Sequence, residues 1–344
     1  MVRVAINGYG RIGRIAHRVI LQKYKEEIQV VAVNAGSSTD LAGWKYLLKY
    51  DSVYGALPIP IEVEEKTSDD PENFLGKFLI NNEVIAVYSQ KDPQLLPWKD
   101  LQIDVVIEST GAFETREGLE KHIQAGARKV VLSAPAKDDV ETIVLGVNEL
   151  LYKGERVLSN ASCTTNCIAP VAKVMHEQFG IEKAMLTTVH GYTSDQRLQD
   201  GGHKDYRRAR AAGLNIVPTS TGATKTLEKT IPELGGRFSG VALRVPVPVG
   251  SLSDFTFLLS RSTTKEEVND TFKRLAASPE FSHILEVTED PLVSSDIIGN
   301  PHSAIVDLSL TQVVGGNMVK VVAWYDNEYG YANRLVEEVL LAAS

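Results

Sequence analysis

The sequence predicts an α/β protein in which a Rossmann-type domain is followed by an α+β domain with a mainly antiparallel sheet. Short apolar strands alternate with helices over the first 160 or so residues, a pattern that favours a mostly parallel sheet with right-handed crossovers. A glycine-rich turn, GYGRIG at 8–13, follows the first strand at once. Beyond residue 163 the strands become longer and helices fewer, which is typical of antiparallel pairing.

Length and composition agree with two ordinary globular domains. The chain has 344 residues, with 43% hydrophobic and 23% charged residues. The net charge of −8 argues against binding of nucleic acid or an anionic membrane by the whole chain. No apolar run approaches the length of a membrane span, and the chain opens directly into a strand, so we expect neither a span nor a signal segment.

The first elements are a strand at 2–7 and a helix at 14–24, joined by the glycine turn. In a dinucleotide fingerprint, Gly8 makes the tight turn, Gly10 lets a pyrophosphate approach the backbone, and Gly13 lets the helix pack closely on the strand. The alternative is a glycine turn that binds nothing. The other elements expected in this half are strands at 28–33, 59–63, 78–80, 84–88, 103–108, 129–133, 142–145 and 156–159, and helices at 40–49 and 115–125.

The segment that begins at Asn34, after the second strand, bears on cofactor choice. An NAD-selective site normally places Asp or Glu here to bind the ribose hydroxyls, but this chain has Ala35, and Asp40 comes too late. Without that carboxylate, nothing repels a 2′-phosphate, and Ser37 and the N–H of Gly36 could bind one. We therefore expect NADP to be accepted. The alternative is that the ribose is only held less tightly.

Two later segments belong to the same expected ligand edge. Lys91 lies in a turn and could reach the adenosine end of a dinucleotide, although a solvated lysine fits the sequence equally well. Ser109, Thr110 and Gly111 follow the strand at 103–108. Ligands bind at the carboxyl ends of parallel strands, so these residues are expected near the glycine turn.

The central stretch contains a candidate nucleophile, Cys163, where a strand ends and a helix is expected to begin. The N–H groups and dipole of a helix N-terminus lower a thiol pKa, so this position favours a thiolate. A β-type run, TTVH, delivers His190 downstream, and a Cys–His pair is the usual arrangement for nucleophilic catalysis. A buried cysteine without chemistry is the alternative. The other cysteine, Cys167, lies four residues on, and such a spacing suits a disulfide poorly, which indicates a reducing compartment.

The second half contains a long polar, basic stretch, 191–218, and stretches of this kind inside compact domains are usually functional. Within it, one of Arg207 or Arg208 is expected near an anion. The run Thr219–Gly222 offers hydroxyls and an N–H group at a helix start. Arg244 lies in mid-strand, where it needs an anionic partner or a solvated cleft. The expected strands are 184–189, 239–245, 253–259, 303–307 and 318–324, and the expected helices 224–230, 264–277 and 332–342.

Taken together, these motifs resemble the phosphorylating glyceraldehyde-3-phosphate dehydrogenase family over the whole chain. The matching segments are INGYGRIGR at 6–14, NASCTTNC at 160–167, TTVHGYT at 187–193, RRARAA at 207–212, PTSTGA at 218–223, RVPVP at 244–248 and WYDNE at 324–328. The resemblance implies a dinucleotide-binding domain at 1–162, completed by a C-terminal helix at 328–344, and a catalytic and tetramerisation domain at 163–327. It further implies a cytoplasmic homotetramer of carbohydrate metabolism (glycolysis or gluconeogenesis), with no metal and no membrane or obligate nucleic-acid partner.

The resemblance also implies the chemistry. D-glyceraldehyde 3-phosphate would be oxidised reversibly, with phosphate and NADP or NAD, to 1,3-bisphosphoglycerate through a thioester on Cys163, with His190 as the base. The implied ligand residues are Asn7, Arg11, Ile12 and Thr110 in the cofactor groove, Asn327 at the nicotinamide carboxamide with Tyr331 near it, Thr193, Asp195 and Arg244 at the substrate phosphate, and Ser162, Thr164, Arg208, Thr221 and Gly222 at the attacking phosphate.

Four positions, in three segments, depart from the family pattern. Ala35 stands where NAD-specific members carry Asp, and Gly201-Gly202 replaces a bulky Leu-Pro in the loop expected near the neighbouring subunit's adenosine ribose. Both changes open the same space and resemble the branch that uses NADP, so NADP is the expected cofactor and NAD the second. Gly191 stands where Ser or Ala is usual, and the sequence offers no reason for it.

Two other functions remain open at this point. Erythrose-4-phosphate dehydrogenase is a close relative that releases a free acid and differs at the phosphate-attack segment, so the intact Thr219–Gly222 favours the phosphorylating enzyme. A Cys-His hydrolase, or a binding protein without redox chemistry, is a more distant alternative. The glycine turn and Asn327 argue against a hydrolase, and the intact pair of Cys163 and His190 argues against a binding protein.

Overall fold

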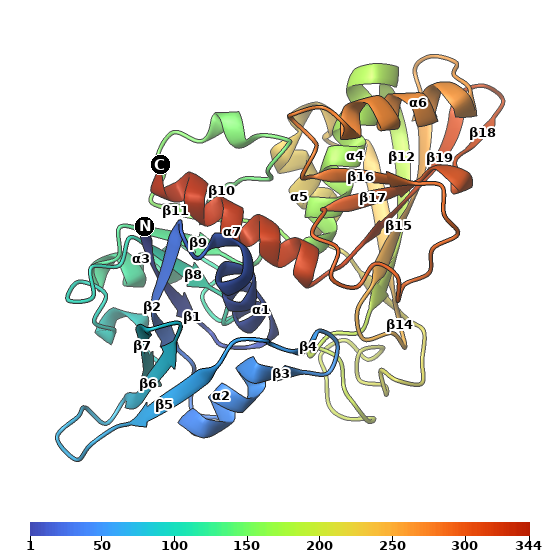
Figure 1. Cartoon of the computed structure of the whole chain (residues 1–344). Coiled ribbons are helices and arrows are strands. Elements are labelled where there is room, and N and C mark those ends of the chain that lie inside the picture. The colour runs from blue at the N-terminus through green and yellow to red at the C-terminus, as the bar shows by residue number, and fades with distance from the viewer. The chain divides into compact units, whose positions relative to one another are not determined.

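The computed structural model describes all residues from Met1 to Ser344 and divides into two compact units (Figure 1). Unit 1 consists of Met1–Ile143, Tyr152–Ala161 and Ala332–Ser344, and unit 2 of Val144–Leu151 and Ser162–Tyr331. The expected α/β class is confirmed, with one largely parallel and one largely antiparallel sheet. The segment Val144–Leu151 belongs to unit 2 although it precedes the last strand of unit 1.

Unit 1 is built on a nine-stranded sheet of order β10-β11-β9-β8-β1-β2-β7-β6-β5. All neighbouring pairs from β10 to β7 are parallel, and β7-β6-β5 is an antiparallel meander. The strands are β1 (Val2–Asn7), β2 (Ile28–Asn34), β5 (Ile61–Glu65), β6 (Phe74–Ile80), β7 (Glu83–Tyr88), β8 (Val105–Glu108), β9 (Lys129–Leu132), β10 (Glu141–Thr142) and β11 (Val157–Ser159), with β3 (Tyr50–Asp51) and β4 (Gly55–Ala56) as a separate pair.

The first helix of unit 1 begins earlier than the sequence indicates. It begins at Arg11, because the first helical hydrogen bond already joins the Arg14 N–H to the Gly10 carbonyl. The helix runs Arg11–Val19 (α1) and continues as a π-helix, η1 (Ile20–Tyr24). The glycine turn is therefore short and leads straight into the helix. The other helices are α2 (Leu41–Lys49), η2 (Pro93–Leu95), α3 (Arg116–Gln124) and the C-terminal α7 (Tyr329–Ala343).

Unit 2 contains an eight-stranded sheet, with the path β13-β14-β12-β15-β19-β17-β16 and β18 paired to β19. Its pairs are antiparallel except β12–β14 and β16–β17. The strands are β12 (Ile181–Gly191), β13 (Val217–Ser220), β14 (Phe238–Val245), β15 (Ser251–Leu259), β16 (Leu285–Thr288), β17 (Ala304–Asp307), β18 (Gln312–Val314) and β19 (Met318–Tyr325). The sequence does not predict β13, β16 or β18, which are short and lack clear alternation.

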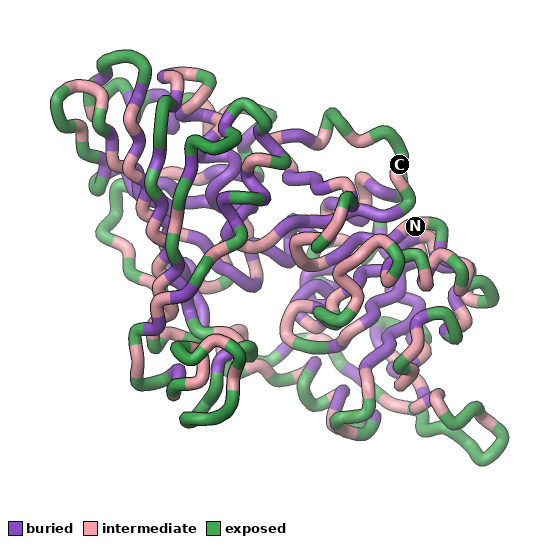
Figure 2. Tube along the Cα trace, turned by 180° about the vertical axis from the view of Figure 1, so that it is seen from behind, coloured by how far each residue is buried: buried purple, intermediate pink, exposed green.

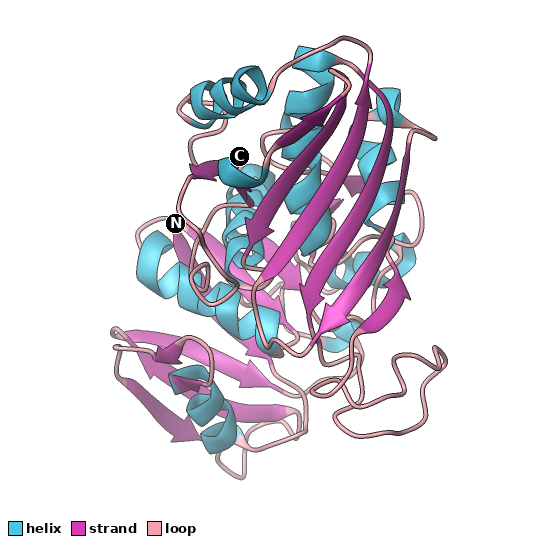
Figure 3. Cartoon of the chain, turned by 90° about the vertical axis from the view of Figure 1, so that its right-hand side faces the viewer, coloured by secondary structure: helices cyan, strands magenta, loops and turns pink.

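The helices of unit 2 gather on one face of this sheet (Figure 3). They are α4 (Cys163–Phe179), α5 (Ala223–Thr230) and α6 (Lys265–Ala276), with the short η3 (Glu149–Leu151), η4 (Pro232–Leu234) and η5 (Leu308–Leu310). Residues alternate between buried and half-buried along β15, and Phe255 stacks on Phe257 at 5.3 Å. Figure 2 shows buried residues along the strands, while the loop at 192–216 is mostly exposed or half-buried.

One buried group works against the stability of unit 1. Glu338 in α7 is fully buried, and neither carboxylate oxygen has a hydrogen-bond partner. Burial raises the pKa of this carboxyl well above its ordinary value. The folded chain therefore keeps a proton that the unfolded chain releases, so stability is highest below the ordinary glutamate pKa and falls as pH rises towards the raised folded-state pKa.

Replacing this side chain should stabilise the protein. Glu338→Met keeps a similar volume and removes the unpartnered carboxyl, so the free energy of unfolding at pH 7 should increase by about 1–3 kcal/mol. The gain should be larger at pH 8 than at pH 5, as measured by thermal unfolding at both values. Glu120→Met, at an exposed position of α3, is the control and should change little. A gain that is equal at both pH values would contradict the account.

Candidate active site

Cys163 is the first residue of α4, as the sequence predicts. Ser162 is the N-cap, and its hydroxyl accepts a hydrogen bond from the Thr165 N–H at 3.0 Å. The residue before the cap, Ala161, has a φ of 56°, a left-handed conformation that costs about 1–2 kcal/mol for a residue with a Cβ. The strained turn and the cap together hold the half-buried thiol at the start of the helix.

His190 faces this thiol from β12. Its Nε2 lies 3.4 Å from Cys163 Sγ, and the imidazole is buried. The ring of Tyr325 packs edge-on against the imidazole at 6.0 Å, and its hydroxyl lies 3.1 Å from Thr164 Oγ1. The sequence predicts the pair of Cys163 and His190 but not the contact with Tyr325. The only sequence signal for Tyr325 is its place in the segment WYDNE at 324–328. The unit thus holds a thiol and an imidazole in hydrogen-bonding reach, the arrangement that cysteine nucleophiles require.

The protonation states differ from the expectation for a helix N-terminus. Burial raises the pKa of the Cys163 thiol, and this outweighs the opposing effects of the Arg244 guanidinium and of hydrogen bonds at Thr164 and the helix start. The expected lowered thiol pKa is therefore wrong for this structure. Burial, aided by Arg244, lowers the pKa of His190 to about 3. At neutral pH the pair is a thiol beside a neutral imidazole, which can accept a proton.

Arg244 lies directly beside His190, because β14 pairs with β12 in a register that places the two residues opposite each other. Its Nη1 is 2.7 Å from His190 Nδ1 and 3.2 Å from the Gly191 carbonyl oxygen. No carboxylate lies within ion-pair distance of its guanidinium, so the expected anionic partner of this mid-strand arginine is not part of the chain. The charge of this half-buried side chain is therefore available to an anionic ligand.

The second arginine of interest, Arg208, is already engaged. It donates hydrogen bonds to Asp195 and to Thr219 Oγ1, and Asp205 lies 3.5 Å away. Burial tends to raise the pKa of Asp195, but its hydrogen bonds with Arg208 and His203 outweigh this and lower the pKa, so Asp195 is ionised. The structure thus brings together Asp195 and Arg208, which the sequence analysis expects at different phosphates. Arg207 is exposed.

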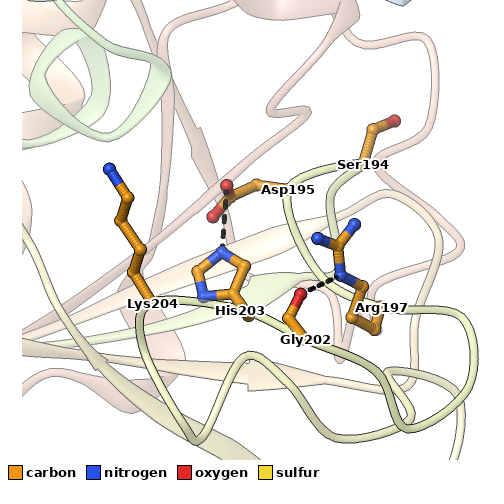
Figure 4. Close-up of a pocket in the computed structure, with 6 residues that line it drawn as sticks. All are labelled: Ser194, Asp195, Arg197, Gly202, His203 and Lys204. Atoms are coloured by element: carbon orange, nitrogen blue, oxygen red, sulfur yellow. Dashed lines mark hydrogen bonds and ion pairs between the residues drawn. The ribbon is translucent and has the colours of Figure 1, made fainter.

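The loop that carries these residues makes hydrogen bonds within itself and lines an open, shallow pocket of about 740 Å³ (Figure 4). His203 contacts Asp195 at 3.4 Å across it, and Arg197 Nε donates to the Gly202 carbonyl at 2.8 Å. Gly201 and Gly202 are exposed, and Gly202 has open space where a Cβ would be. The pocket lining consists of Ser194, Asp195, Arg197, Gly202, His203 and Lys204.

The remaining expected phosphate residues of unit 2 make local hydrogen bonds. The Thr193 N–H donates to the Gln196 side chain at 3.3 Å, and Thr221 Oγ1 accepts from the Ala223 N–H at 3.2 Å. Gly222 is the exposed N-cap residue of α5.

A chain of hydrogen bonds links the histidine strand to Asn327. The Gly191 N–H donates to Ser251 Oγ at 3.2 Å, and Ser251 Oγ donates to Asn327 Oδ1 at 2.9 Å. The Gly250 N–H donates to the same Oδ1 at 3.1 Å. This fixes the amide and leaves Asn327 Nδ2 as a donor for a ligand. Sequence reasoning missed Ser251, a common residue type without a motif of its own.

The structure supplies a reason for Gly191. A Cβ at this position would lie 2.9 Å from the Val247 carbonyl oxygen, closer than real Cβ atoms approach. That carbonyl accepts a hydrogen bond from the Tyr192 N–H at 3.0 Å. A glycine is therefore needed where the chain at 247 packs onto the end of β12.

In unit 1, the glycine turn and the residues after β8 are packed backbone to backbone. A Cβ on Gly13 would lie 2.1 Å from the Gly8 carbonyl oxygen, and a Cβ on Gly8 would lie 2.5 Å from the Thr110 nitrogen. Ser109 Oγ donates to the Gly8 carbonyl at 2.7 Å. The crowding accounts for two of the three fingerprint glycines, while Gly10 is exposed and open, as a residue approached by a ligand must be.

A buried carboxylate holds the polar residues of this edge. Glu108 accepts hydrogen bonds from Asn7 Nδ2 at 2.5 Å, from the Thr110 N–H at 2.8 Å, and from His122 Nε2 at 3.0 Å. Trp98 Nε1 donates to His122 Nδ1 at 2.9 Å, so the proton of the neutral ring is on Nε2 and points at Glu108. This network fixes Asn7 and Thr110, and the sequence gives no sign of it.

The segments after β2 and β7 lie side by side. Asn34 and Gln90 exchange hydrogen bonds in both directions at 2.8 Å. This brings the exposed side chains of Ser37 and Lys91 to the same edge of the sheet. Asp40 is occupied as the N-cap of α2, where it accepts from the Gly43 N–H at 2.8 Å.

The other expected cofactor residues differ in their exposure. Arg11 forms an ion pair with Asp51 at 3.1 Å, and Ile12 is half-buried. Gly111 is exposed and has a φ of 69°. Ala35 and Tyr331 are both buried, and the N–H of Ala35 donates to the Tyr88 carbonyl at 2.8 Å.

Comparison with known proteins agrees with both units. Residues 2–116 match the glyceraldehyde 3-phosphate dehydrogenase NAD binding domain, and residues 162–327 match the C-terminal domain of the same family. Proteins named glyceraldehyde-3-phosphate dehydrogenase from Streptomyces coelicolor and Mycolicibacterium smegmatis are 49% and 48% identical to this chain, over 98% and 99% of it and 97% and 98% of their own lengths. Glyceraldehyde-3-phosphate dehydrogenase 2 from Streptomyces avermitilis is 49% identical, over 98% of this chain and 97% of its own length.

None of the helices combines the length and apolar character that crossing a membrane requires. Two matched domain models and near-full-length identity of about half settle the relationship: the chain belongs to the glyceraldehyde 3-phosphate dehydrogenase family.

Proposed function

We propose that this chain oxidises D-glyceraldehyde 3-phosphate, with inorganic phosphate and a nicotinamide dinucleotide, to 1,3-bisphosphoglycerate. The observation that carries the proposal is the 3.4 Å contact between Cys163 Sγ, at the start of α4, and the neutral base His190. When bound, the dinucleotide supplies the hydride acceptor. The crowded turn at Gly8 and the free Nδ2 of Asn327 suit the pyrophosphate and the carboxamide of such a group.

The reaction follows from the protonation states of the pair. His190 Nε2 accepts the thiol proton as Cys163 Sγ attacks the aldehyde carbon, and the imidazolium returns that proton to the new oxyanion, giving a hemithioacetal. His190 then accepts the hydroxyl proton as hydride leaves the same carbon, so that a thioester forms. Phosphate attacks the thioester and releases the acyl phosphate and the thiolate, which recovers the proton from His190.

Two anion sites serve this sequence. Arg244, whose charge has no carboxylate partner, binds the substrate phosphate, together with Thr193. Arg208 binds the attacking phosphate, with Ser162, Thr164, Thr221 and the N–H of Gly222 around it. In this site the guanidinium of Arg208 turns part of its hydrogen bonding from Asp195 to the incoming phosphate. Asp195 then positions Arg208 and does not contact the phosphate itself.

In unit 1 the proposed cofactor groove consists of residues held by the buried network and the glycine turn. Asn7 and Thr110 are fixed by Glu108, and Ser109 by the carbonyl of Gly8. The full proposed set is Asn7, Gly8, Gly10, Arg11, Ile12, Gly13, Asn34, Ala35, Ser37, Lys91, Ser109, Thr110 and Gly111, with Asn327 and Tyr331 at the nicotinamide end. Arg11 would keep its ion pair with Asp51 in this role.

The preferred cofactor of the proposal is NADP. No carboxylate stands at position 35, and Asp40 is occupied as a helix cap. Ser37 and Lys91 are exposed at the edge that the exchange between Asn34 and Gln90 brings together. These side chains offer a hydroxyl and a positive charge to a 2′-phosphate, and NAD remains the second cofactor.

The proposed working form is a cytoplasmic homotetramer. Met185, Val241 and Met318 are exposed on strands of the unit 2 sheet, and a mainly apolar cavity of about 420 Å³ lies between Met185, Phe238 and Met318. Such a surface suits burial against another subunit. Both cysteines are free thiols, in keeping with a reducing compartment.

Phosphate dependence separates this function from erythrose-4-phosphate dehydrogenase activity. The proposed enzyme reduces NADP or NAD with glyceraldehyde 3-phosphate only slowly until phosphate is added, because phosphate releases the acyl group. An enzyme that prefers erythrose 4-phosphate and turns over without phosphate would contradict the proposal.

The nucleophile can be tested with two cysteine variants. Cys163→Ser should abolish oxidation, because a hydroxyl is a far weaker nucleophile at neutral pH. Cys167→Ser is the matched control and should keep most of the activity, since the Cys167 thiol is fully buried. Mass mapping after iodoacetamide treatment should find the label on Cys163. Labelling of Cys167 first, with activity retained, would refute the assignment.

The base can be tested by removing its proton acceptor. His190→Asn keeps a polar side chain but cannot accept the proton, so kcat should fall by about 10²–10⁴. Alkylation of Cys163 near neutral pH should slow as well, because the thiol loses its base. If kcat and the alkylation rate were both unchanged, His190 would be only structural.

Cofactor preference depends on the charge at position 35. Ala35→Asp should disfavour NADP by about 1–3 kcal/mol, roughly 5- to 150-fold in kcat/KM, because a carboxylate there repels the 2′-phosphate. Ala35→Asn has nearly the same size without the charge and should shift the ratio much less. Adding Gly201→Leu and Gly202→Pro to Ala35→Asp should shift it further towards NAD. Native activity with NADP a hundredfold below that with NAD would rule out this explanation.

A further inference from the structure

The contacts of His190 Nδ1 make incompatible demands on it. The Gly191 carbonyl oxygen lies 2.7 Å from Nδ1 and can only accept a hydrogen bond. Arg244 Nη1 lies at the same distance and can only donate one. A neutral imidazole cannot satisfy both, because Nδ1 either carries a proton or presents a lone pair. The site therefore has two arrangements, which differ in where the ring proton lies.

The first arrangement has no proton between Nδ1 and the Gly191 carbonyl oxygen, two acceptors 2.7 Å apart, and the guanidinium of Arg244 serves both of them. Arg244 Nη1 donates to the Nδ1 lone pair and, at 3.2 Å, to the Gly191 carbonyl, so that carbonyl keeps a donor. The proton of the imidazole is then on Nε2 and points at Cys163 Sγ, 3.4 Å away. In this state Nε2 is a donor to sulfur and cannot accept the thiol proton.

The second arrangement needs the guanidinium to leave Nδ1. Nδ1–H then donates to the Gly191 carbonyl at 2.7 Å, and Nε2 presents its lone pair to Cys163. The Gly191 carbonyl is fixed in position as the acceptor, because the peptide groups on both sides of it are hydrogen-bonded. The Gly191 N–H donates to Ser251 Oγ, and the Tyr192 N–H donates to the Val247 carbonyl. The ring of Tyr325 packs against the imidazole, so the change requires little movement of His190.

We propose that Arg244 sets the tautomer of His190, and that an anion which binds Arg244 converts Nε2 from a donor into the base that Cys163 requires. This inference rests on the proposed function, in which Arg244 binds the substrate phosphate. The exchange conserves charge: Nε2 gives up one proton to solvent, and Nδ1 takes one up. Arg244 is thus a positioning residue for the base as well as a ligand, and a bound phosphate-bearing substrate increases the fraction of His190 that can act as the base.

Nitrogen-15 NMR of the full chain, labelled at histidine, tests this without turnover, because protonated and bare ring nitrogens differ widely in chemical shift. The His190 signals are identified by their loss in His190→Asn. In the free protein, in a buffer without phosphate or sulfate, we expect Nε2 protonated and Nδ1 bare. Glycerol 3-phosphate, a phosphomonoester without an aldehyde, should reverse this, with a change of about tenfold or more in the tautomer ratio.

Two variants sharpen the test. Arg244→Gln removes the charge and should give the Nδ1-protonated form with or without glycerol 3-phosphate. Arg207→Gln removes the charge of an exposed neighbour of Arg208 and should behave as the native chain. A free native protein already protonated on Nδ1, or a tautomer that no concentration of glycerol 3-phosphate changes, overturns the inference.

The inference and the proposed function can fail separately. The native-chain spectra stand even if Arg244→Gln does not fold. Phosphate-dependent oxidation with an unchanging tautomer would refute the role of Arg244 and leave the enzyme activity intact. A tautomer that switches in a protein with no dehydrogenase activity would refute the proposed function and leave the switch.

Discussion

The contact between Cys163 and the neutral imidazole of His190 is the interaction on which the proposed chemistry of unit 2 depends. Burial disfavours charge on both groups: it raises the pKa of the thiol and lowers that of the imidazole. The pair therefore rests uncharged at neutral pH. The positive charge of Arg244 and the start of α4 lie where they can stabilise a negative charge that develops on the sulfur.

Backbone packing fixes the surroundings of His190. The register of β12 and β14 sets Arg244 opposite His190, and the glycine at 191 lets the chain at Val247 close over the end of β12. From there Ser251 connects the same strand end to Asn327. One short chain of hydrogen bonds thus connects Asn327, the proposed nicotinamide ligand, to the strand end that carries His190, the proposed base. In unit 1, the carboxylate of Glu108 has the equivalent role for Asn7 and Thr110.

Local patterns predicted the class of both sheets, most of their strands, and the start of α4 at Cys163. Alternation, glycine turns and helix caps depend on residues that are close together in the sequence, so the sequence alone reveals them. They did not predict what depends on burial or on distant partners. The raised pKa of Cys163 follows from its surroundings in the folded unit, which outweigh the helix dipole. The ion pair of Asp195 with Arg208, the packing of Tyr325 on His190, and the bond from Ser251 to Asn327 join residues that no local motif connects. The early start of α1 at Arg11 reflects a turn shorter than its glycines suggest.

The central claim is that Cys163 carries the acyl group between oxidation and phosphate attack. It is tested most directly by mixing the native protein with glyceraldehyde 3-phosphate and NADP in the absence of phosphate, quenching in acid, and locating any added mass by peptide mass spectrometry. The account predicts a phosphoglyceryl thioester on the peptide that contains Cys163, and its loss when phosphate is added before the quench. Reduction of the cofactor without any acyl group on that peptide, or an acyl group on another residue, would contradict it.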